Sequence, residues 1–176
     1  MPSYHTYLIS SLPMLQFSAK QPLNLEDFFS RCSQLIPAEE VELIKKVVSE
    51  DAYALDVSSS GVIKGWRDFD LILRNELVKL RAVRKKTDAL KFLRKDAHFD
   101  MELTRIAQAA LRQHSILEAE KFLDLERWKK LEQLAQGHYF DLDFLLVYAL
   151  KLSILERWSN INNSDKTKTL EKVLGN

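Results

Sequence analysis

The feature that most constrains this chain is a long apolar stripe with helical spacing in its middle. Residues recur there at steps of three and four positions, namely Trp66, Phe69, Leu73, Leu77 and Leu80, and the spacing continues to Val83 or Arg84. A helix places such residues on one face, whereas a strand would scatter them over both. The 176 residues include only four Gly and four Pro, too few for the many turns of a β-sandwich. The sequence therefore predicts an all-α protein.

Capping residues and breakers predict about six or seven helices in a single helical domain over residues 1–176. Asn24 can cap one helix, and Ser115 with Glu118 three residues later forms a capping box. Gly137 suits a left-handed helix stop. Other helices are expected after Pro37, from about Lys64, after Thr87, after Asp100 and after Asp141, with a polar loop at 160–164 before a short C-terminal helix. The architecture expected is a helical bundle.

The N-terminal segment, about residues 4–17, is expected to be a short extended arm. Tyr7, Leu8 and Ile9 favour a strand, and Pro13 stops a helix. An unpaired strand is unstable in a core, so we expect the arm to lie across the helices. Leu12 and Pro13 in this apolar arm are candidate contact residues.

Composition and motifs argue against several classes of function. The net charge of +1 gives no global field for nucleic acid or an anionic membrane. The lone Cys32 is expected to be a small buried hydrophobe. The chain lacks a His-Glu-x-x-His pair, a phosphate-binding loop and a nucleophile elbow, and we predict no catalytic, cofactor-binding or metal-ligating residues. With no secretory signal and no apolar run long enough to span a bilayer, the protein is expected in the cytoplasm.

Charge is distributed unevenly along the chain. Residues 1–56 carry 4 basic and 8 acidic side chains, whereas residues 57–100 carry 11 basic and 6 acidic ones. Such asymmetry favours an internal or intersubunit electrostatic fit. The basic run 81–95 could alternatively grip phosphates, which makes a helical nucleic-acid-binding module the rival hypothesis. Asp88 interrupts the run, and a solvated helix end is the simpler interpretation.

Polar residues within the apolar stripe form a candidate interaction site or structural network. Arg74, Asn75 and Arg81 lie in the same predicted helix as Trp66. A partly buried arginine needs a carboxylate partner, because an unpaired buried charge costs several kcal/mol. Asp70 is one turn from Arg74 and is the local candidate, while Glu126 or Glu156 could reach across the bundle; Glu76 and Lys79 can pair likewise. The cluster is either structural or a docking surface for a partner subunit.

Several stretches resemble an uncharacterised bacterial family that is encoded among V-type ATPase genes. The resemblance lies in residues 4–15, 25–28, 66–69, 73–77 and 80–82. A weaker similarity links the chain to the helical C/d-type subunit that couples the central stalk to the rotor ring of V- and A-type ATPases. It rests on the stripe residues and on Ala119-Glu120, Arg127-Trp128, Phe140-Asp141 and Tyr148. The chain is far shorter than that three-lobed subunit.

The resemblance implies a non-catalytic subunit or accessory factor of a proton- or sodium-translocating rotary ATPase. Its partners would be V-type ATPase subunits near the central stalk or the rotor, and it would bind no nucleic acid. It supplies no catalytic residues. A small enzyme is a third hypothesis, which would require a cleft that gathers titratable groups without structural partners.

Overall fold

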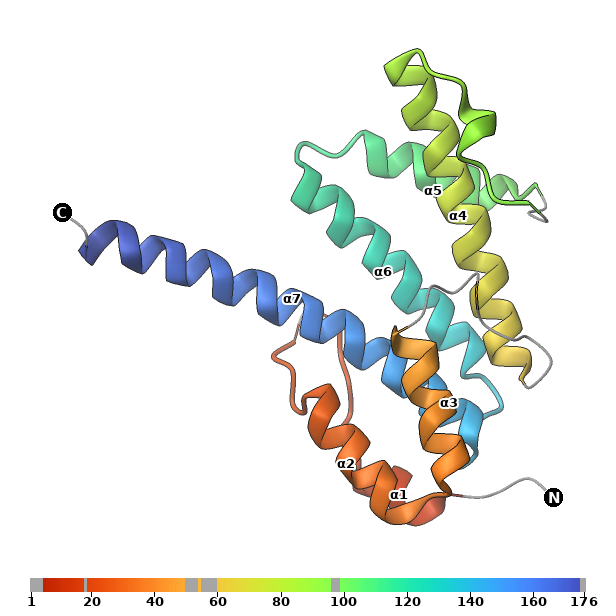
Figure 1. The fold of residues 1–176 in the computed structure, drawn as a ribbon, viewed down its shortest axis with the longest axis vertical. Helices are drawn as coiled ribbons and strands as arrows, with labels where there is room; N and C mark the ends of the chain where they lie inside the picture. The colour runs from red at the N-terminus through yellow and green to blue at the C-terminus, as the bar shows by residue number, and fades with distance from the viewer. Residues whose placement is uncertain (1–4, 18, 50–53, 55–59, 96–98, 175–176) are drawn as a thin grey trace. The chain divides into compact units, whose positions relative to one another are not determined.

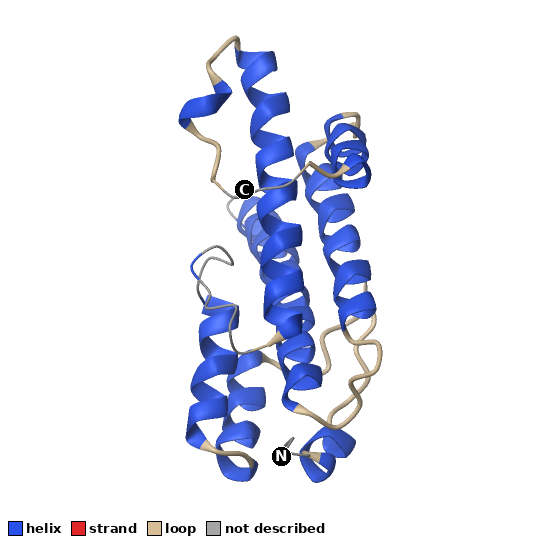
Figure 2. Ribbon diagram, turned by 90° about the vertical axis from the view of Figure 1, so that its right-hand side faces the viewer, coloured by secondary structure: helices blue, strands red, loops and turns tan. Residues whose placement is uncertain are grey.

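The computed structural model describes residues 5–17, 19–49, 54, 60–95 and 99–174, with side chains described as far as residue 163. These residues include the seven α-helices α1–α7 and the short 3-10 helix η2, and no strand is found in them. Figure 2 shows the same alternation of helices and loops. The all-α prediction is confirmed. The chain divides into two compact units, Met1–Val48 with His138–Asn176 and Ser49–Gly137. The expectation of a single domain over 1–176 stays a prediction.

The first unit consists of α1 (Thr6–Ser11), α2 (Leu25–Leu35), α3 (Ala38–Ser49) and the long α7 (Leu142–Leu174). Helix α2 packs against both α1 and α7. Asn24 caps α2 by accepting a hydrogen bond from the Asp27 N–H at 2.7 Å, as the sequence predicts. Phe28 and Tyr148 join α2 to α7 with ring centroids 5.3 Å apart. The buried side chains of this unit include Leu8, Phe28, Cys32, Ile44, Leu145, Leu146 and Leu152.

The second unit consists of α4 (Gly61–Lys85), η2 (Ala89–Lys91), α5 (Met101–Leu111) and α6 (Ile116–Leu134). Helices α4, α5 and α6 all pack on one another, and η2 folds back onto α4 (Figure 1). A Cβ at Gly65 would lie 2.6 Å from Leu134 Cδ2, so the glycine permits a close approach of α6 to α4. The predicted stripe forms the core from Trp66 to Leu77, and Val62 and Ile63 are buried before it. Its predicted end is wrong, because Val83 and Arg84 are exposed near the end of α4.

The N-terminal arm differs from the sequence prediction in one respect. Residues Thr6–Ser11, expected to be extended, form the short helix α1. Leu8 and Ile9 are buried, and α1 contacts α2, so this packing outweighs their strand propensity. The chain becomes extended at Leu12, and the Tyr148 hydroxyl donates a 2.9 Å hydrogen bond to the Pro13 carbonyl. The arm therefore lies against α7, as expected.

Two further boundaries require correction. The helix expected after Thr87 is only the single turn η2, which Asp88 caps through the Leu90 N–H at 3.0 Å. The loop expected at 160–164 is part of the continuous helix α7. Asn and Ser reduce helix stability by well under 1 kcal/mol each relative to Ala, and the stretch contains no Gly or Pro to end the helix. Weak helix formers in this stretch therefore do not interrupt α7.

Several large apolar side chains stay exposed in the described part of the second unit. Val83 and Ile116 are 78% and 85% exposed, and Leu90 and Phe92 follow at 78% and 64%. Large exposed apolar side chains that lie together mark places where proteins contact one another.

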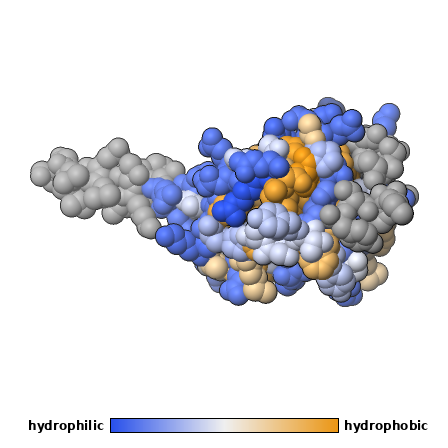
Figure 3. All heavy atoms as spheres, turned by 90° about the horizontal axis from the view of Figure 1, so that it is seen from below, coloured by the Kyte–Doolittle hydropathy of each residue, from blue (hydrophilic) through white to orange (hydrophobic). Residues whose placement is uncertain are grey.

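Figure 3 shows one face of the molecule, seen from below, on which hydrophobic residues lie beside hydrophilic ones.

Candidate functional site

Helix α4 carries most of the candidate residues, and both of its ends are built for a long helix. The Ser60 hydroxyl accepts hydrogen bonds from the Val62 and Ile63 N–H groups at 3.0 and 3.3 Å. The helix therefore starts three residues before the predicted Lys64. It ends at Lys85, and the cap residue Lys86 has a left-handed φ of 55°. Arg84 and Lys85 occupy the last turn, where cations offset the negative end of the helix dipole.

Two arginines and two buried aspartates form an ion network between α4 and α6. Arg74 Nε lies 2.6 Å from Asp70 Oδ2, and Arg127 Nε lies 3.8 Å from Asp70 Oδ1. An Arg127 terminal nitrogen (Nη1) donates to Asp124 Oδ1 at 2.9 Å. Asp70 and Asp124 are 3% and 1% exposed. The alternation of charges compensates the cost of burying both carboxylates. We call these four residues the Asp70–Asp124 network.

The local part of this network follows from the sequence. The predicted pairs Asp70–Arg74 and Glu76–Lys79 both form, each at 2.6 Å. Glu126 does not take part, because it pairs with Lys129 at 2.7 Å on its own helix.

Sequence reasoning did not assign Asp124 and Arg127 to the network. Asp124 precedes Trp128 and Leu131 at steps of four and three on the buried side of α6. An acidic residue in register with an apolar stripe is a signal that could have identified it.

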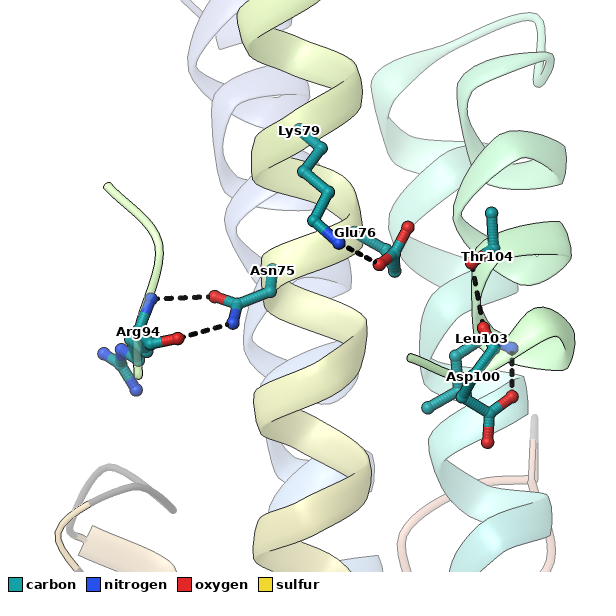
Figure 4. A network of polar contacts seen from close by, with 7 residues as sticks. All are labelled: Asn75, Glu76, Lys79, Arg94, Asp100, Leu103 and Thr104. Carbon is teal, nitrogen blue, oxygen red and sulfur yellow. Dashed lines mark hydrogen bonds and ion pairs between the residues drawn. The ribbon is translucent and has the colours of Figure 1, made fainter. Parts of the chain in front are cut away.

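Asn75 acts as a clamp between α4 and the segment after η2 (Figure 4). Its amide nitrogen donates to the Arg94 carbonyl at 2.8 Å, and its amide oxygen accepts from the Arg94 N–H at 3.0 Å. The buried amide thus satisfies both backbone groups of one residue, as a neighbouring strand would. Trp66 is likewise buried and stacks on Phe69, with ring centroids 6.0 Å apart. The contacts of Asn75 and Trp66 therefore serve to hold the fold together.

Arg81 is exposed and lies apart from the network, on the rim of a groove of about 810 Å³. The buried or half-buried Leu77, Ala110, Leu111 and Leu123 form an apolar floor, and Arg81, Arg84 and Lys85 form a basic rim. We call this cavity the Arg81 groove. The idea of Arg81 as a partly buried, paired arginine is wrong. Its position near the end of α4 leaves the guanidinium open to a partner.

A second cavity of about 430 Å³ lies between α4, α5 and α6 and mixes acidic and basic groups. Several of its polar groups have structural partners. Asp100 caps α5 through the Glu102 and Leu103 N–H groups at 2.8 and 3.0 Å (Figure 4 shows the bond to Leu103), and Glu126 pairs with Lys129. Asp100 and Glu126 therefore serve the fold, while Asp68 and Glu102 are the other two carboxylates that line the cavity.

Two histidines in the described part of the first unit lie close to carboxylates. His5 Nε2 lies 2.7 Å from Glu40 Oε2, and His138 Nδ1 lies 2.6 Å from Asp141 Oδ2. Partial burial is the largest single influence on the pKa of Asp141, and by itself it acts to raise that pKa. The hydrogen bonds from His138 and from the Phe144 N–H, with the His138 charge, outweigh it and lower the pKa below the ordinary 3.8. The first pair links the residue before α1 to α3, and the second links two residues that precede α7.

Two other groups in the first unit have their pKa values raised by burial. Desolvation raises the pKa of the Cys32 thiol to about 11 and that of the Tyr148 hydroxyl to about 12. Among the described residues, no group of three His, Cys, Asp or Glu side chains could hold a metal ion. None of the helices described is both long and apolar enough to span a bilayer.

Comparison with known proteins gives one match. The model of a family described as "Protein of unknown function (DUF2764)" matches residues 52–176, which is most of the chain. No curated protein and no solved structure matches the chain. The matched residues include all of the Asp70–Asp124 network and the Arg81 groove.

Proposed function

We propose that this chain, which belongs to the DUF2764 family, is a non-catalytic subunit or accessory factor of a V-type, ion-translocating ATPase. It acts by protein–protein contact near the central stalk or the rotor. It resides in the cytoplasm and reaches the membrane only through the complex. The resemblance of residues 4–15 and of the stretches between 66 and 82 to proteins encoded with V-type ATPase genes supports the ATPase assignment.

The observation that carries the contact function is the Arg81 groove. Buried charges such as Asp70 and Asp124 are used within the fold, whereas Arg81, Arg84 and Lys85 are exposed around an apolar floor. Val83 and Ile116 are exposed apolar side chains on the same two helices, α4 and α6. Apolar surface surrounded by charge is typical of a protein interface. The groove therefore suits docking better than chemistry.

A pull-down from the native cell tests the assignment. The chain is tagged at its C-terminus, expressed at its natural level and purified gently at low salt. We expect V-type ATPase subunits in the eluate, identified by mass spectrometry and absent from a control strain that expresses the tag on an unrelated helical protein. An eluate without ATPase subunits, although the tagged chain is folded and abundant, contradicts the proposal.

A helical nucleic-acid-binding module is the second candidate function. The basic run 81–95 supports it, because Arg84, Lys85 and Lys91 are exposed and Phe92 is an exposed aromatic side chain nearby. This alternative predicts binding to random-sequence DNA or RNA that weakens steeply as salt rises. A salt titration with labelled single-stranded DNA and RNA tests it, and no binding at low salt removes it.

A further inference from the structure

We infer that the Arg81 groove binds an acidic, amphipathic helix of a partner protein. This inference rests on the proposed contact function and names the kind of partner segment that the groove fits.

The groove has the form that a helix with one apolar face requires. Its floor consists of Leu and Ala side chains from three helices, with Leu77 on α4, Leu111 on α5 and Leu123 on α6. The volume of about 810 Å³ lies at the upper end of the range for pockets that enclose a small ligand, so several apolar side chains fit. Ile116 and Leu117 are exposed at the start of α6 and extend the apolar surface. Helices dock into such grooves through residues at positions i, i+3, i+4 and i+7.

The charge of the groove selects an acidic partner. Arg81, Arg84 and Lys85 line it, and none is ion-paired with a carboxylate of the described residues. Glu120 is the only acidic side chain among the lining residues, and the positive end of α6 opens into the same groove at Ser115. Carboxylates that flank the apolar face of a docked helix would meet these cations.

The acidic N-terminal part of the chain does not offer a suitable occupant from a second copy. Its acidic helix α3 carries Glu39 and Glu42 on the outside. The apolar side chains of α3, however, are used within the fold, because Val41, Ile44 and Val47 are buried. A second copy could present the charges of this helix but not its apolar face. A separate partner protein is therefore the occupant that fits.

The floor also argues against a nucleic acid in the groove. Single-stranded nucleic acids are held by aromatic side chains on which bases stack, together with cations along the backbone. The residues that line the Arg81 groove include no Phe, Tyr or Trp. The aliphatic floor of the Arg81 groove instead suits contact with aliphatic side chains of a peptide.

A designed peptide tests the inference on the full-length protein. The probe is a fluorescein-labelled helical peptide of about 18 residues, or five turns, with Leu on one face and Glu flanking it. A matched peptide has the same composition in scrambled order, which removes the apolar face. Fluorescence anisotropy measures both peptides against the wild-type protein and against two charge-reversed variants, Arg81→Glu/Arg84→Glu and the control Lys91→Glu/Lys95→Glu. All four residues are in the described part of the second unit, and the control pair does not line the groove.

We expect the amphipathic peptide to bind wild type and the control variant, and to bind Arg81→Glu/Arg84→Glu at least about tenfold more weakly. The scrambled peptide should bind none of them tightly. Circular dichroism confirms that both variants are folded. The inference is overturned if the amphipathic peptide does not bind, if both peptides bind alike, or if the groove variant binds as wild type does. The inference is overturned too if the groove variant instead abolishes binding of single-stranded DNA. The same holds if the groove variant instead abolishes self-association of the protein, measured by sedimentation.

The two proposals can fail separately. If the native pull-down recovers ATPase subunits with wild type and equally with Arg81→Glu/Arg84→Glu, the proposed function stands and the groove inference falls. If the peptide test succeeds but no ATPase subunit is recovered with wild type, the groove is a docking site and the ATPase assignment is wrong.

Discussion

Replacement of Arg127 by methionine is the sharpest test of what holds the second unit together. Arg127 bridges the two buried carboxylates of the Asp70–Asp124 network, at 2.9 Å from Asp124 and 3.8 Å from Asp70. Methionine keeps an unbranched side chain with flexible packing and removes only the charge and the donors. The variant therefore isolates the electrostatic role of the guanidinium.

The expected cost follows from burial and from the partners that remain. Removal of one member of a fully buried ion pair costs about 3–5 kcal/mol. Here the Arg127 side chain is 16% exposed, and Asp70 keeps Arg74 at 2.6 Å. Both facts reduce the loss, and we expect Arg127→Met to lower the free energy of unfolding by about 2–3 kcal/mol. At about 2–4 °C per kcal/mol for a chain of this size, the melting temperature should fall by about 4–12 °C.

Urea unfolding followed by circular dichroism at the helical band measures the change. Lys129→Met is the matched control, since Lys129 pairs with Glu126 at 2.7 Å on the same helix but its side chain is 54% exposed. Such a surface pair contributes at most about 1 kcal/mol. A double-mutant cycle of Asp124→Asn and Arg127→Met should show a coupling energy of about 1–3 kcal/mol. If Arg127→Met costs no more than Lys129→Met, or if the coupling is absent, the network does not stabilise the fold.

Three further predictions concern single residues. Gly137→Ala should destabilise the protein by about 1–2 kcal/mol because φ is +87° there, whereas Gly61→Ala should change the stability by less than about 1 kcal/mol, both measured by urea unfolding. Cys32 should stay unreactive toward a disulfide reagent at pH 8 until urea unfolds the chain, since a pKa of about 11 leaves about one thiolate in a thousand; rapid labelling of the folded protein would contradict this. Asp141→Asn keeps the helix cap but loses the carboxylate that His138 holds. The pKa of Asp141 is lower in the folded protein than its ordinary value of 3.8, so the carboxylate contributes fully to stability above that value. This contribution is lost as the pH falls below it. The difference in stability between wild type and Asp141→Asn should therefore be present at pH 6 and should disappear toward pH 2.

The sequence predicts those parts of the structure that depend on near neighbours. Ser115 caps α6 through the Glu118 N–H at 3.1 Å, and Asp70 pairs with Arg74 one turn away. Both interactions connect residues three or four positions apart, so helical geometry alone places the partners in reach. The Ser115 cap likewise separates α5, which ends at Leu111, from α6, and Gly137 is left-handed, as the sequence predicts, three residues after α6 ends at Leu134.

Interactions between distant residues could not be predicted in this way. The Asn75 clamp joins residues 19 positions apart, and the link from Asp70 to Arg127 depends on how α4 meets α6. Arg81 looked like Arg74 in the sequence, since both follow the same stripe at a step of seven. Only Arg74 has a carboxylate one turn earlier on its own helix, because position 77 before Arg81 is a leucine. That difference separates Arg74, which is paired with Asp70, from Arg81, which has no carboxylate one turn earlier on α4.

The charged residues of the second unit can therefore be separated by experiment. Arg127 is largely buried and joined to two aspartates, so its loss should lower stability, and any effect on binding should follow from unfolding. Arg81 and Arg84 are exposed on the groove rim, and their reversal to Glu should change the free energy of unfolding by no more than about 0.5 kcal/mol each while it weakens the acidic peptide. The opposite result, in which Arg127→Met stays stable and Arg81→Glu/Arg84→Glu unfolds, would mean that Arg81 and Arg84 stabilise the fold. A cation can attract a partner helix only if its charge is not already used to stabilise the fold. Docking at the Arg81 groove therefore depends on this separation of roles.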